Sequence, residues 1–290
     1  MQRTFNQGEA TIRCRPAGPA GIGEELLPQL RVLPLRTIRV TRYVTPLREG
    51  GSLPAIVEGD DDGMYVLKFR GAGQGARALI AELVSGEIAR ALALPVPEIV
   101  LAELDRDLAR TEPDPEIHAL ILDSAGLNLA LDYLPGSVTF DPVADRLASE
   151  LASRIVWFDA YAMNVDRTAR NTNMLMWHRR PWLIDPGATL YFHHTPGWQA
   201  GADRSRDPFT MIKDHVLLRA AGSLDEVDAG LASALTPDVL GGILSAVPDA
   251  WLEADARPGE AQLFRDAYVR HLLGRLEAPR PFLREAARVR

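Results

Sequence analysis

Three polar residues near the middle of the chain have the types and spacing of a site that handles phosphate and a metal ion. Asp166 and Asn171 stand five residues apart in NVDRTARN, and Asp185 follows in LIDPG, fourteen residues after Asn171. Carboxylate and amide oxygens are ligands that Mg²⁺ accepts alongside phosphate oxygens, and a further carboxylate can orient an attacking hydroxyl group. The spacing therefore predicts phosphoryl transfer, with Asn171 and Asp185 on the metal and Asp166 as the catalytic carboxylate.

A lysine upstream supplies a matching cation. Lysine is rare in this chain, which has only Lys68 and Lys213, so a lysine in the apolar strand YVLKF suggests a specific role. Protein-kinase-type sites place a strand lysine on the ATP phosphates and pair it with a helix glutamate. Glu82 is the predicted partner, because it shares a helix face with small residues, and Glu87 is the competitor. The plain alternative for Lys68 is a strand edge from which its head reaches solvent.

Two glycine-rich segments lie close to this lysine in sequence. Gly50, Gly51 and Ser52 join the first two predicted strands, where a loop covering the phosphates belongs. Glycines let backbone N–H groups approach phosphate oxygens, so we expect these three residues to contact a nucleotide; an ordinary hairpin turn is the alternative. GAGQG, residues 71–75, follows the lysine strand and is interpreted as a linker.

The central Asp–Asn–Asp set also has a plain structural interpretation. Asp and Asn favour Asx turns, and Asp-Pro-Gly is a common turn sequence. The functional interpretation is preferred for two reasons. The three residues have the order and spacing expected of a single site, and Asp185 follows the apolar run PWLI. His193 and His194 further on are assigned to the segment after the site rather than to a metal pair, because neighbouring strand residues point to opposite faces.

Other residues near the motifs are given supporting roles. Asp159, on the helix before the loop, is predicted to support that loop. Arg167 and Arg170 are predicted either to hold phosphates or to be solvated charges. Three tryptophans are predicted to be core residues: Trp157, Trp177 and Trp182.

The elements that must position these residues differ between the two halves of the chain. Alternating apolar runs in the first half predict strands, at 37–44, 53–59, 64–69, 97–104, 117–123 and 127–134. One helix, 78–94, interrupts them. Helical spacing prevails later, beginning with a long helix at 143–164, and a strand, a turn and a short strand follow at 180–192.

Separate strand-rich and helix-rich halves predict an α+β fold with two lobes. The β-rich N-lobe, an antiparallel sheet with one helix, is expected at 34–135. The α-rich C-lobe, which carries the catalytic and metal-binding loops, is expected at 136–290. Residues 1–33 have little periodicity and are interpreted as a flexible leader.

Composition limits the class of protein. The formal net charge is −7 and the arginines are scattered, so direct binding of nucleic acid through a basic stripe is not expected. The sequence contains no run of 18 apolar residues, so no membrane-spanning helix is predicted. The N-terminal sequence lacks the apolar core of a secretory signal, and Cys14, the single cysteine, has no internal partner. These features predict a cytoplasmic protein.

Together these segments resemble the HipA-like kinase family, bacterial relatives of serine/threonine kinases that also resemble phosphatidylinositol kinases. The resemblance covers about residues 37–220, through PLREGGSLPAIVE, YVLKF with GAGQG, AELVSGEIARALALPVPE, NVDRTARN and LIDPG. It implies a protein-kinase-like fold that uses ATP and Mg²⁺, with Asp166 as the base, Asn171 and Asp185 as metal ligands, and Lys68 on the α- and β-phosphates. It also implies that LDYL, 131–134, is the adenine-binding hinge, which adds Asp132, Tyr133 and Leu134 to the nucleotide site.

The chain departs from the family pattern in several places. The serine loop of the family's toxin member has no match here, Arg167 follows Asp166, and Pro-Gly replaces Phe-Gly after Asp185. The resemblance implies a protein serine or threonine as the acceptor. The alternatives are a sugar or antibiotic kinase and a nucleotide-binding regulator without turnover. An open groove over residues 193–198 would favour a protein acceptor, whereas a pocket closed by acidic residues from 200–260 would favour a small molecule.

Overall fold

The structure is a computed structural model that describes residues 35–47, 53–73, 75–200, 204–253 and 259–290. The predicted leader and the predicted phosphate loop, Gly50, Gly51 and Ser52, lie outside the described residues.

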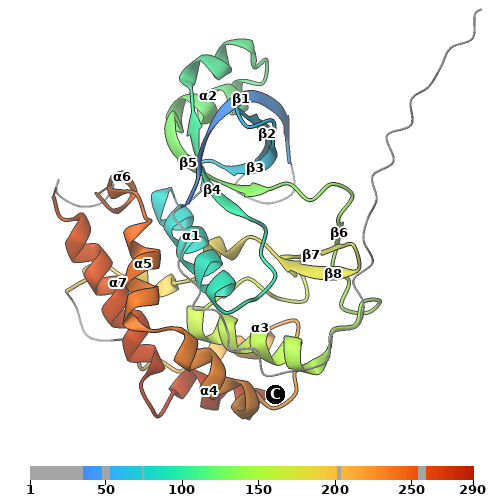
Figure 1. The fold of residues 1–290 in the computed structure, drawn as a ribbon, viewed down its shortest axis with the longest axis vertical. Coiled ribbons are helices and arrows are strands. Elements are labelled where there is room, and N and C mark those ends of the chain that lie inside the picture. Colours follow the sequence, from blue (N-terminus) through green and yellow to red (C-terminus); the bar gives the residue numbers. More distant parts are fainter. Residues whose placement is uncertain (1–34, 48–52, 74, 201–203, 254–258) are drawn as a thin grey trace, which may run out of the picture. The chain divides into compact units, whose positions relative to one another are not determined.

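The first strands form a closed barrel in the order β1-β2-β3-β5-β4 (Figure 1). The predicted antiparallel meander is present, because β1 pairs with β2 and β2 with β3 in antiparallel register. The sheet closes through a parallel pairing that the sequence did not predict, in which Thr37 of β1 lies opposite Leu101 of β4. The strands are β1 (Thr37–Pro46), β2 (Ala55–Gly59), β3 (Met64–Lys68), β4 (Ile99–Leu104) and β5 (Gly126–Asp132).

Alternating side chains fill the barrel. Val57, Leu67 and Val100 are fully buried, and the small residues Ala55 and Ala130 leave room for them. Two register shifts in the β1–β2 pairing mark bulges, and bulges increase the local twist that a closing sheet requires. The barrel therefore has its own apolar core.

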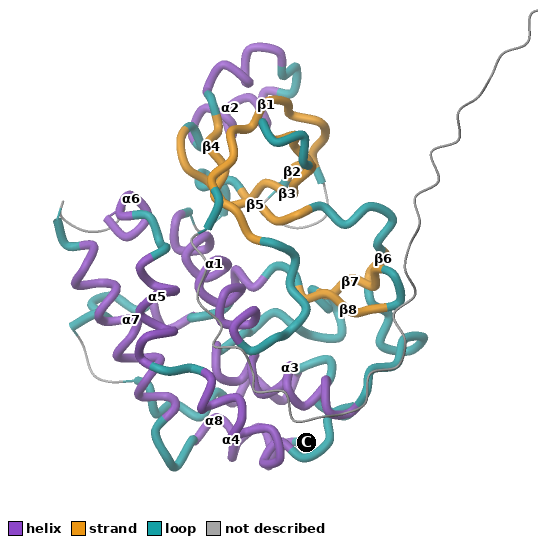
Figure 2. The backbone as a smooth tube through the Cα atoms, viewed as in Figure 1, coloured by secondary structure: helices purple, strands orange, loops and turns teal. Residues whose placement is uncertain are grey.

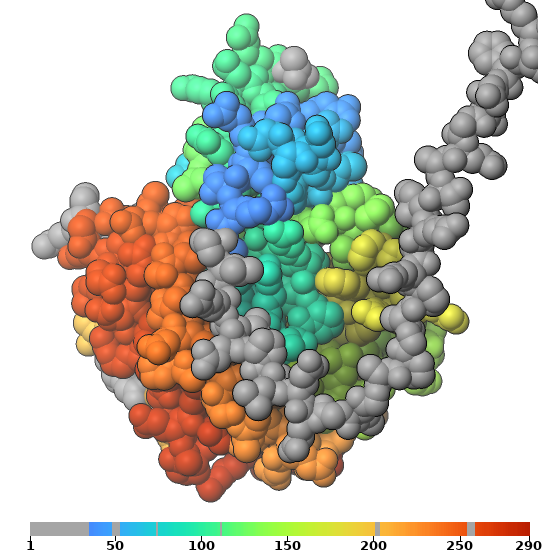
Figure 3. Space-filling model, in the orientation of Figure 1, coloured from blue at the N-terminus to red at the C-terminus, as the bar shows by residue number. Residues whose placement is uncertain are grey.

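Helix α1 (Ala76–Ala91) is buried on nearly all sides. Its small residues allow close approach to its neighbours: a Cβ added at Gly86 would lie 2.4 Å from Ile99 Cδ1 of β4. The adjacent Ser85 points to a different neighbour, and its Oγ lies 2.6 Å from Thr189 Oγ1. Helix α1 thus packs against both the barrel and the segment after Asp185. On the surface, the strand-rich part (blue) and the C-terminal helices (orange) are seen around this central region (Figure 3).

Residues 117–123 form helix α2 (Pro115–Asp123), so the strand predicted there is wrong. Asp114 caps the helix by accepting a hydrogen bond from the Glu116 N–H at 3.0 Å, and Pro115 occupies the first turn, as is typical of helix starts. Ile117 and Ile121 are buried and stand four residues apart, on one helix face. A short 3₁₀ helix, η1 (Arg106–Thr111), lies in the region predicted as loop.

The long helix predicted at 143–164 is shorter in the structure, where α3 spans Ser149–Ala162. Side-chain contacts occupy the backbone before it. Asp141 Oδ1 accepts from the Val143 N–H at 2.8 Å, and Arg146 Nη1 donates to the Val143 carbonyl at 2.8 Å. These local contacts compete with helix formation.

A small sheet, β6 (Val138–Thr139), β7 (Met174–Trp177) and β8 (Arg180–Leu183), lies below the barrel (Figure 2). The second strand predicted within 180–192 is wrong. The 3₁₀ helices η2 (Pro186–Ala188) and η3 (Tyr191–His194) take its place. Asp185 and Leu190 have φ angles of 52°, and these left-handed residues break the extended path.

The C-terminal part is helical, as predicted, and packs around α3. Trp157 and Tyr161 of α3 stack at 5.3 Å, and Phe282 meets Trp157 edge-on at 5.5 Å. Trp157 is a core residue, whereas Trp177 and Trp182 are only half-buried. The elements are η4 (Thr210–Asp214), α4 (Leu224–Ala234), α5 (Pro237–Ser245), α6 (Asp249–Leu252), α7 (Ala261–Leu276) and α8 (Pro281–Val289).

Strand-rich and helix-rich parts follow one another along the chain, which confirms the α+β class. In the described ranges, no single helix has both the length and the apolar composition of a membrane span. One bent pair, α4 with α5, passes that test by length and composition.

Candidate active site

Lys68, at the end of β3, joins two carboxylates that come from distant parts of the chain. Its Nζ lies 2.9 Å from Glu82 Oε1 on α1 and 2.6 Å from Asp185 Oδ1. Lys68 is 7% exposed and Glu82 is 5% exposed, so the lysine does not reach solvent at a strand edge. Glu87 Oε1 instead lies 3.4 Å from Arg90 Nη1. The structure therefore pairs Lys68 with Glu82, as the sequence predicted.

Two carboxylates share one ammonium group, and this shifts all three pKa values. Burial disfavours the charged lysine, but Glu82 and Asp185 raise the pKa of Lys68 above its ordinary value. Burial raises the pKa of Asp185, but Lys68 outweighs it and holds that pKa below its usual range. Burial raises the pKa of Glu82 to about 8. The cluster has excess negative charge when both carboxyls are ionised, which suits a cation or a cation–phosphate complex.

The backbone holds Asp185 in a sharp turn. Its φ and ψ are 52° and 55°, a left-handed conformation that aspartate tolerates better than most residues. Gly187 follows, and a Cβ there would lie 3.3 Å from Glu82 Oε1. The Pro-Gly that follows Asp185 therefore allows this turn to approach α1 closely.

Asp166 and Asn171 meet at the end of the loop after α3. Asn171 Nδ2 donates to Asp166 Oδ2 at 2.8 Å, and Asn173 Nδ2 donates to the same oxygen at 3.2 Å. The Asx turn belongs to Asn164 instead, whose Oδ1 accepts from the Asp166 N–H at 3.1 Å. The Asp166 carboxylate is thus bound by side chains across the loop rather than by its own turn. Because Asn171 donates through its nitrogen, its Oδ1 can face a cation.

Asn173 is a site residue that the sequence analysis missed. Besides contacting Asp166, its Nδ2 lies 3.4 Å from the Asp185 carbonyl oxygen, so it links the loop to the turn that carries Asp185. Its φ of 46° marks a local bend. The sequence shows this second asparagine in RNTN, but its spacing from the other motif residues did not indicate which side chain it contacts.

A buried ionic network supports the same loop. Asp159 Oδ2 lies 2.6 Å from Arg167 Nε and 2.8 Å from His215 Nε2, and Asp159 Oδ1 accepts from Asn164 Nδ2 at 2.7 Å. Burial raises the pKa of Asp159, but Arg167 and His215 hold it below its ordinary value. Asp159 therefore supports the loop, as expected.

Arg167 differs from both of its predicted roles. It is 1% exposed, so it is neither a solvated charge nor an exposed contact for phosphate. Its Nη1 donates to the carbonyl of Asn173 and, at 3.4 Å, to that of Thr172. Arg167 thus ties the start of the loop to its end. Arg170 is exposed.

The histidine pair lies in η3, beyond the turn. His193 Nδ1 lies 2.8 Å from Tyr268 Oη, and His193 Nε2 lies 3.1 Å from His194 Nε2. Burial, with smaller contributions from His194 and Arg77, holds the pKa of His193 well below its ordinary value. Within the described ranges, no group of three or more His, Cys, Asp or Glu residues could hold a metal ion.

The predicted hinge lies where β5 leaves the barrel. The N–H groups of Asp132 and Tyr133 donate to the carbonyls of Glu98 and Met64, at 2.9 and 3.0 Å. These two donors are therefore used within the protein. An adenine at this hinge would have to use the N–H of Leu134.

A divalent cation fits the residues present. Glu82 Oε2 is buried without a hydrogen-bond partner in the part of the chain that the structure describes, and the neighbouring Asp185 side chain is partly exposed. Mg²⁺ usually binds through one or two carboxylates and completes its shell with water and phosphate oxygens. Asp185 and Asn171 would hold the ion, so a larger protein ligand set is not required.

Replacing Glu82 by glutamine should flatten the pH dependence of stability. The pKa of Glu82 is raised from 4.5 to about 8 in the folded protein, so unfolding releases a proton between these values. Wild-type stability should therefore fall as the pH rises through this window. Glutamine does not titrate, so the Glu82→Gln variant should lose less unfolding free energy than the wild type over the same rise in pH. Urea unfolding from pH 5 to 8 measures the difference, and parallel curves for the two proteins would contradict the assignment.

The α+β fold and the buried Lys–Glu–Asp set define a kinase-like protein. A sequence model described as HipA-like kinase matches residues 40–283. The chain belongs to the HipA-like kinase family, and it is a kinase that transfers a phosphoryl group from a nucleotide. A comparison with curated proteins found no match.

Solved structures of two kinases are similar to this chain. One is the Helicobacter pylori proinflammatory kinase CtkA, at 12% identity and a TM-score of 0.44 over 88% of this chain and 98% of that one. The other is the Golgi casein kinase with Mn/ADP bound, at 10% identity and a TM-score of 0.46 over 87% of this chain and 73% of that one. Membership in the HipA-like kinase family rests on the sequence-model match over residues 40–283 and not on these two structures.

Proposed function

We propose that this kinase uses ATP and Mg²⁺ to phosphorylate serine or threonine in a protein. The single observation that carries the proposal is the buried contact of Lys68 with both Glu82 and Asp185, from three separate elements. One buried cation thus contacts two carboxyl groups. Here the second carboxylate is partly exposed, which suits a group that meets a ligand.

Each residue then has a role in phosphoryl transfer. Lys68 binds the α- and β-phosphates and Glu82 orients it. Asp166 positions the acceptor hydroxyl and accepts its proton, while Asn171 and Asp185 hold Mg²⁺. When bound, the metal neutralises charge on the phosphate oxygens.

A two-lobed arrangement follows from these roles. The barrel, 37–132, would form the upper lobe and supply Lys68, and the helical part after residue 136 would supply the other reacting groups. The strand end at Asp132, with Tyr133 and Leu134, would act as the hinge between them. ATP would bind at their junction, near Lys68. The cytoplasmic location remains a prediction that rests on the single cysteine.

The surface after the site favours a protein acceptor. A pocket opens beside residues 195–200, and no acidic residue is among the described residues that line it. This differs from the acidic enclosure that would favour a small cationic antibiotic. A protein acceptor is therefore better supported than a small cationic antibiotic.

A direct comparison of acceptors tests this proposal. The kinase would be incubated with labelled ATP and Mg²⁺, and with either a pool of serine- and threonine-centred peptides or a panel of sugars and aminoglycosides. We expect label in peptides and at most background in the small molecules. Transfer only to a sugar or an aminoglycoside would overturn the protein acceptor and leave the kinase assignment intact.

A further inference from the structure

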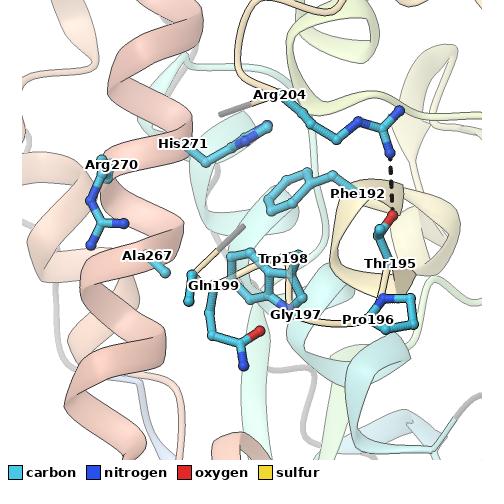
Figure 4. Close-up of a pocket in the computed structure, with 11 residues that line it drawn as sticks. Phe192, Thr195, Pro196, Gly197, Trp198, Gln199, Arg204, Ala267, Arg270 and His271 are labelled. Atoms are coloured by element: carbon cyan, nitrogen blue, oxygen red, sulfur yellow. Dashed lines mark hydrogen bonds between the residues drawn. The ribbon is translucent and has the colours of Figure 1, made fainter. Parts of the chain in front are cut away.

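A pocket of about 350 Å³ lies between helix α7 and the segment that follows η3 (Figure 4). Neither the family match nor the residues with assigned roles in phosphoryl transfer account for it. Its walls come from two stretches of chain: Phe192, Thr195, Pro196, Gly197, Trp198, Gln199, Ala200 and Arg204 on one side, and Ala267, Arg270 and His271 on the other.

Aromatic side chains form a fixed wall of the pocket. Phe192 stacks on His271 at 3.6 Å, and its ring meets Trp198 edge-on at 5.2 Å. Trp198 also contacts Tyr268 of α7 at 4.5 Å. These contacts tie the segment after η3 to α7, so the pocket has a preformed apolar surface. Preformed apolar surface with a few polar groups is typical of binding sites.

Among the described residues that line the pocket, the charged ones are Arg204 and Arg270. Arg204 Nη1 donates to Thr195 Oγ1 at 3.2 Å (Figure 4), and its Nε donates to Asp207 at 2.9 Å. Arg270 is exposed on α7, and among the described residues no hydrogen bond or ion pair engages its guanidinium. The chain as a whole has a net charge of −7. Asp207 balances Arg204, so Arg270 is the uncompensated charge of the described lining, and it favours an anionic ligand by charge complementarity.

The pocket lies within reach of the reacting groups. Ten residues separate Asp185 from Thr195, and ten extended residues span at most ~33–36 Å. Residues 186–188 and 191–194 lie in 3₁₀ helices, which rise only ~2 Å per residue. The pocket is therefore closer than that limit. Asn173 Nδ2 contacts both Asp166 Oδ2 and the Asp185 carbonyl oxygen, so Asp166 lies beside Asp185. An extended acceptor segment of about ten residues is therefore long enough to reach from the pocket to Asp166.

We propose that this pocket binds an acidic segment of the protein acceptor, within about ten residues of the phosphorylated hydroxyl. The inference rests on the proposed function, which requires a protein acceptor. An apolar side chain of that segment contacts Trp198, which is half-buried and backed by the buried Phe192, and a neighbouring carboxylate contacts Arg270. Aromatic residues with arginine are the combination enriched where protein interfaces are tightest.

Peptide binding tests the pocket without requiring turnover. The probe is a fluorescein-labelled 15-residue peptide with a central serine, followed by phenylalanine and three glutamates; its matched peptide has glutamine in place of glutamate. Fluorescence anisotropy would be measured for the wild type, Arg270→Gln, Arg270→Glu and Arg284→Gln. Arg284 is an exposed arginine on α8, so its variant controls for a change in net charge.

We expect the wild type to bind the glutamate peptide more tightly than the glutamine peptide. Arg270→Gln should weaken binding of the glutamate peptide about two- to fivefold, as expected for one exposed ion pair. Arg270→Glu should bind the glutamine peptide more tightly than the glutamate peptide. Arg284→Gln should change neither. The preference should shrink in 0.5 M salt, where screening shortens the range of exposed charges.

Equal affinity of the wild type for the two peptides would overturn the proposal, as would a preference that Arg270→Glu leaves unchanged. Labelling of the same peptides with ATP separates this from the proposed function. Serine phosphorylation without a preference for the glutamate peptide would refute acidic-segment binding by the pocket, and the proposed protein kinase activity would stand. Acidic-peptide binding through Arg270 without phosphorylation of any peptide would refute the protein kinase and retain the binding site.

Discussion

Replacement of Asp185 by asparagine should reduce phosphoryl transfer by about 10²–10³-fold, the size of effect seen when one preorganised electrostatic group is lost, while the fold keeps its stability. Asparagine has nearly the same shape but lacks the charge that would hold Mg²⁺. Lys68 would keep Glu82 as its partner at 2.9 Å. The remaining pair is electrically balanced, so the pKa of Glu82 should move down toward its ordinary range.

The measurement is the rate of transfer from labelled ATP, together with urea unfolding of the same samples. Glu87→Gln is the matched control, because Glu87 lies on the same helix as Glu82 but contacts Arg90. Its rate should change by less than about twofold, because Glu87 shares no ion-pair partner with Lys68 or Asp185 and independent sites couple weakly. If Asp185→Asn turned over at the control rate, Asp185 would be a structural residue only.

Replacement of Arg167 by methionine should cost about 3–5 kcal/mol of unfolding free energy, because it leaves a buried carboxylate without its strongest partner. Asp159 would retain His215 and Asn164, which cannot replace a guanidinium. The same change frees the carbonyls of Thr172 and Asn173, which Arg167 binds. Asn173 contacts Asp166, so turnover should fall as well.

A double variant separates the two effects. Arg167→Met with Asp159→Leu removes both charges, and well-packed apolar replacements of buried pairs are often tolerated. We expect urea unfolding to show that much of the lost stability returns. Turnover should stay low, because the loop carbonyls remain without their donor. Full recovery of turnover in the double variant would show that Arg167 only balances charge.

The sequence predicted two side-chain contacts of the candidate site, because the chemistry expected there restricts the residue types. A rare lysine in an apolar strand, and a helix with a small-residue face around Glu82, sufficed to pair Lys68 with Glu82 rather than Glu87. The spacing of Asp166 and Asn171 anticipated their contact across the loop. Their roles on ATP and metal remain predictions.

Prediction was weaker where contacts between distant segments decide the structure. The apolar run 117–123 suits a strand or a buried helix, and the cap at Asp114 decided for the helix. Arg167 is buried where Asp159 of α3 binds its guanidinium, and Asp159 in turn binds His215 from beyond η4. The parallel pairing of β1 with β4 also depends on contacts far apart in sequence.

The central claim is that Asp166 serves metal-dependent phosphoryl transfer, and one measurement tests it most directly. Labelled ATP, the serine/threonine peptide pool and the wild type or Asp166→Ala would be incubated with Mg²⁺ or with EDTA. We expect transfer by the wild type that requires Mg²⁺, and a rate about 10²–10⁴-fold lower for Asp166→Ala, as is typical for loss of a general base. Equal rates for the two proteins, or wild-type transfer that persists in EDTA, would contradict the claim.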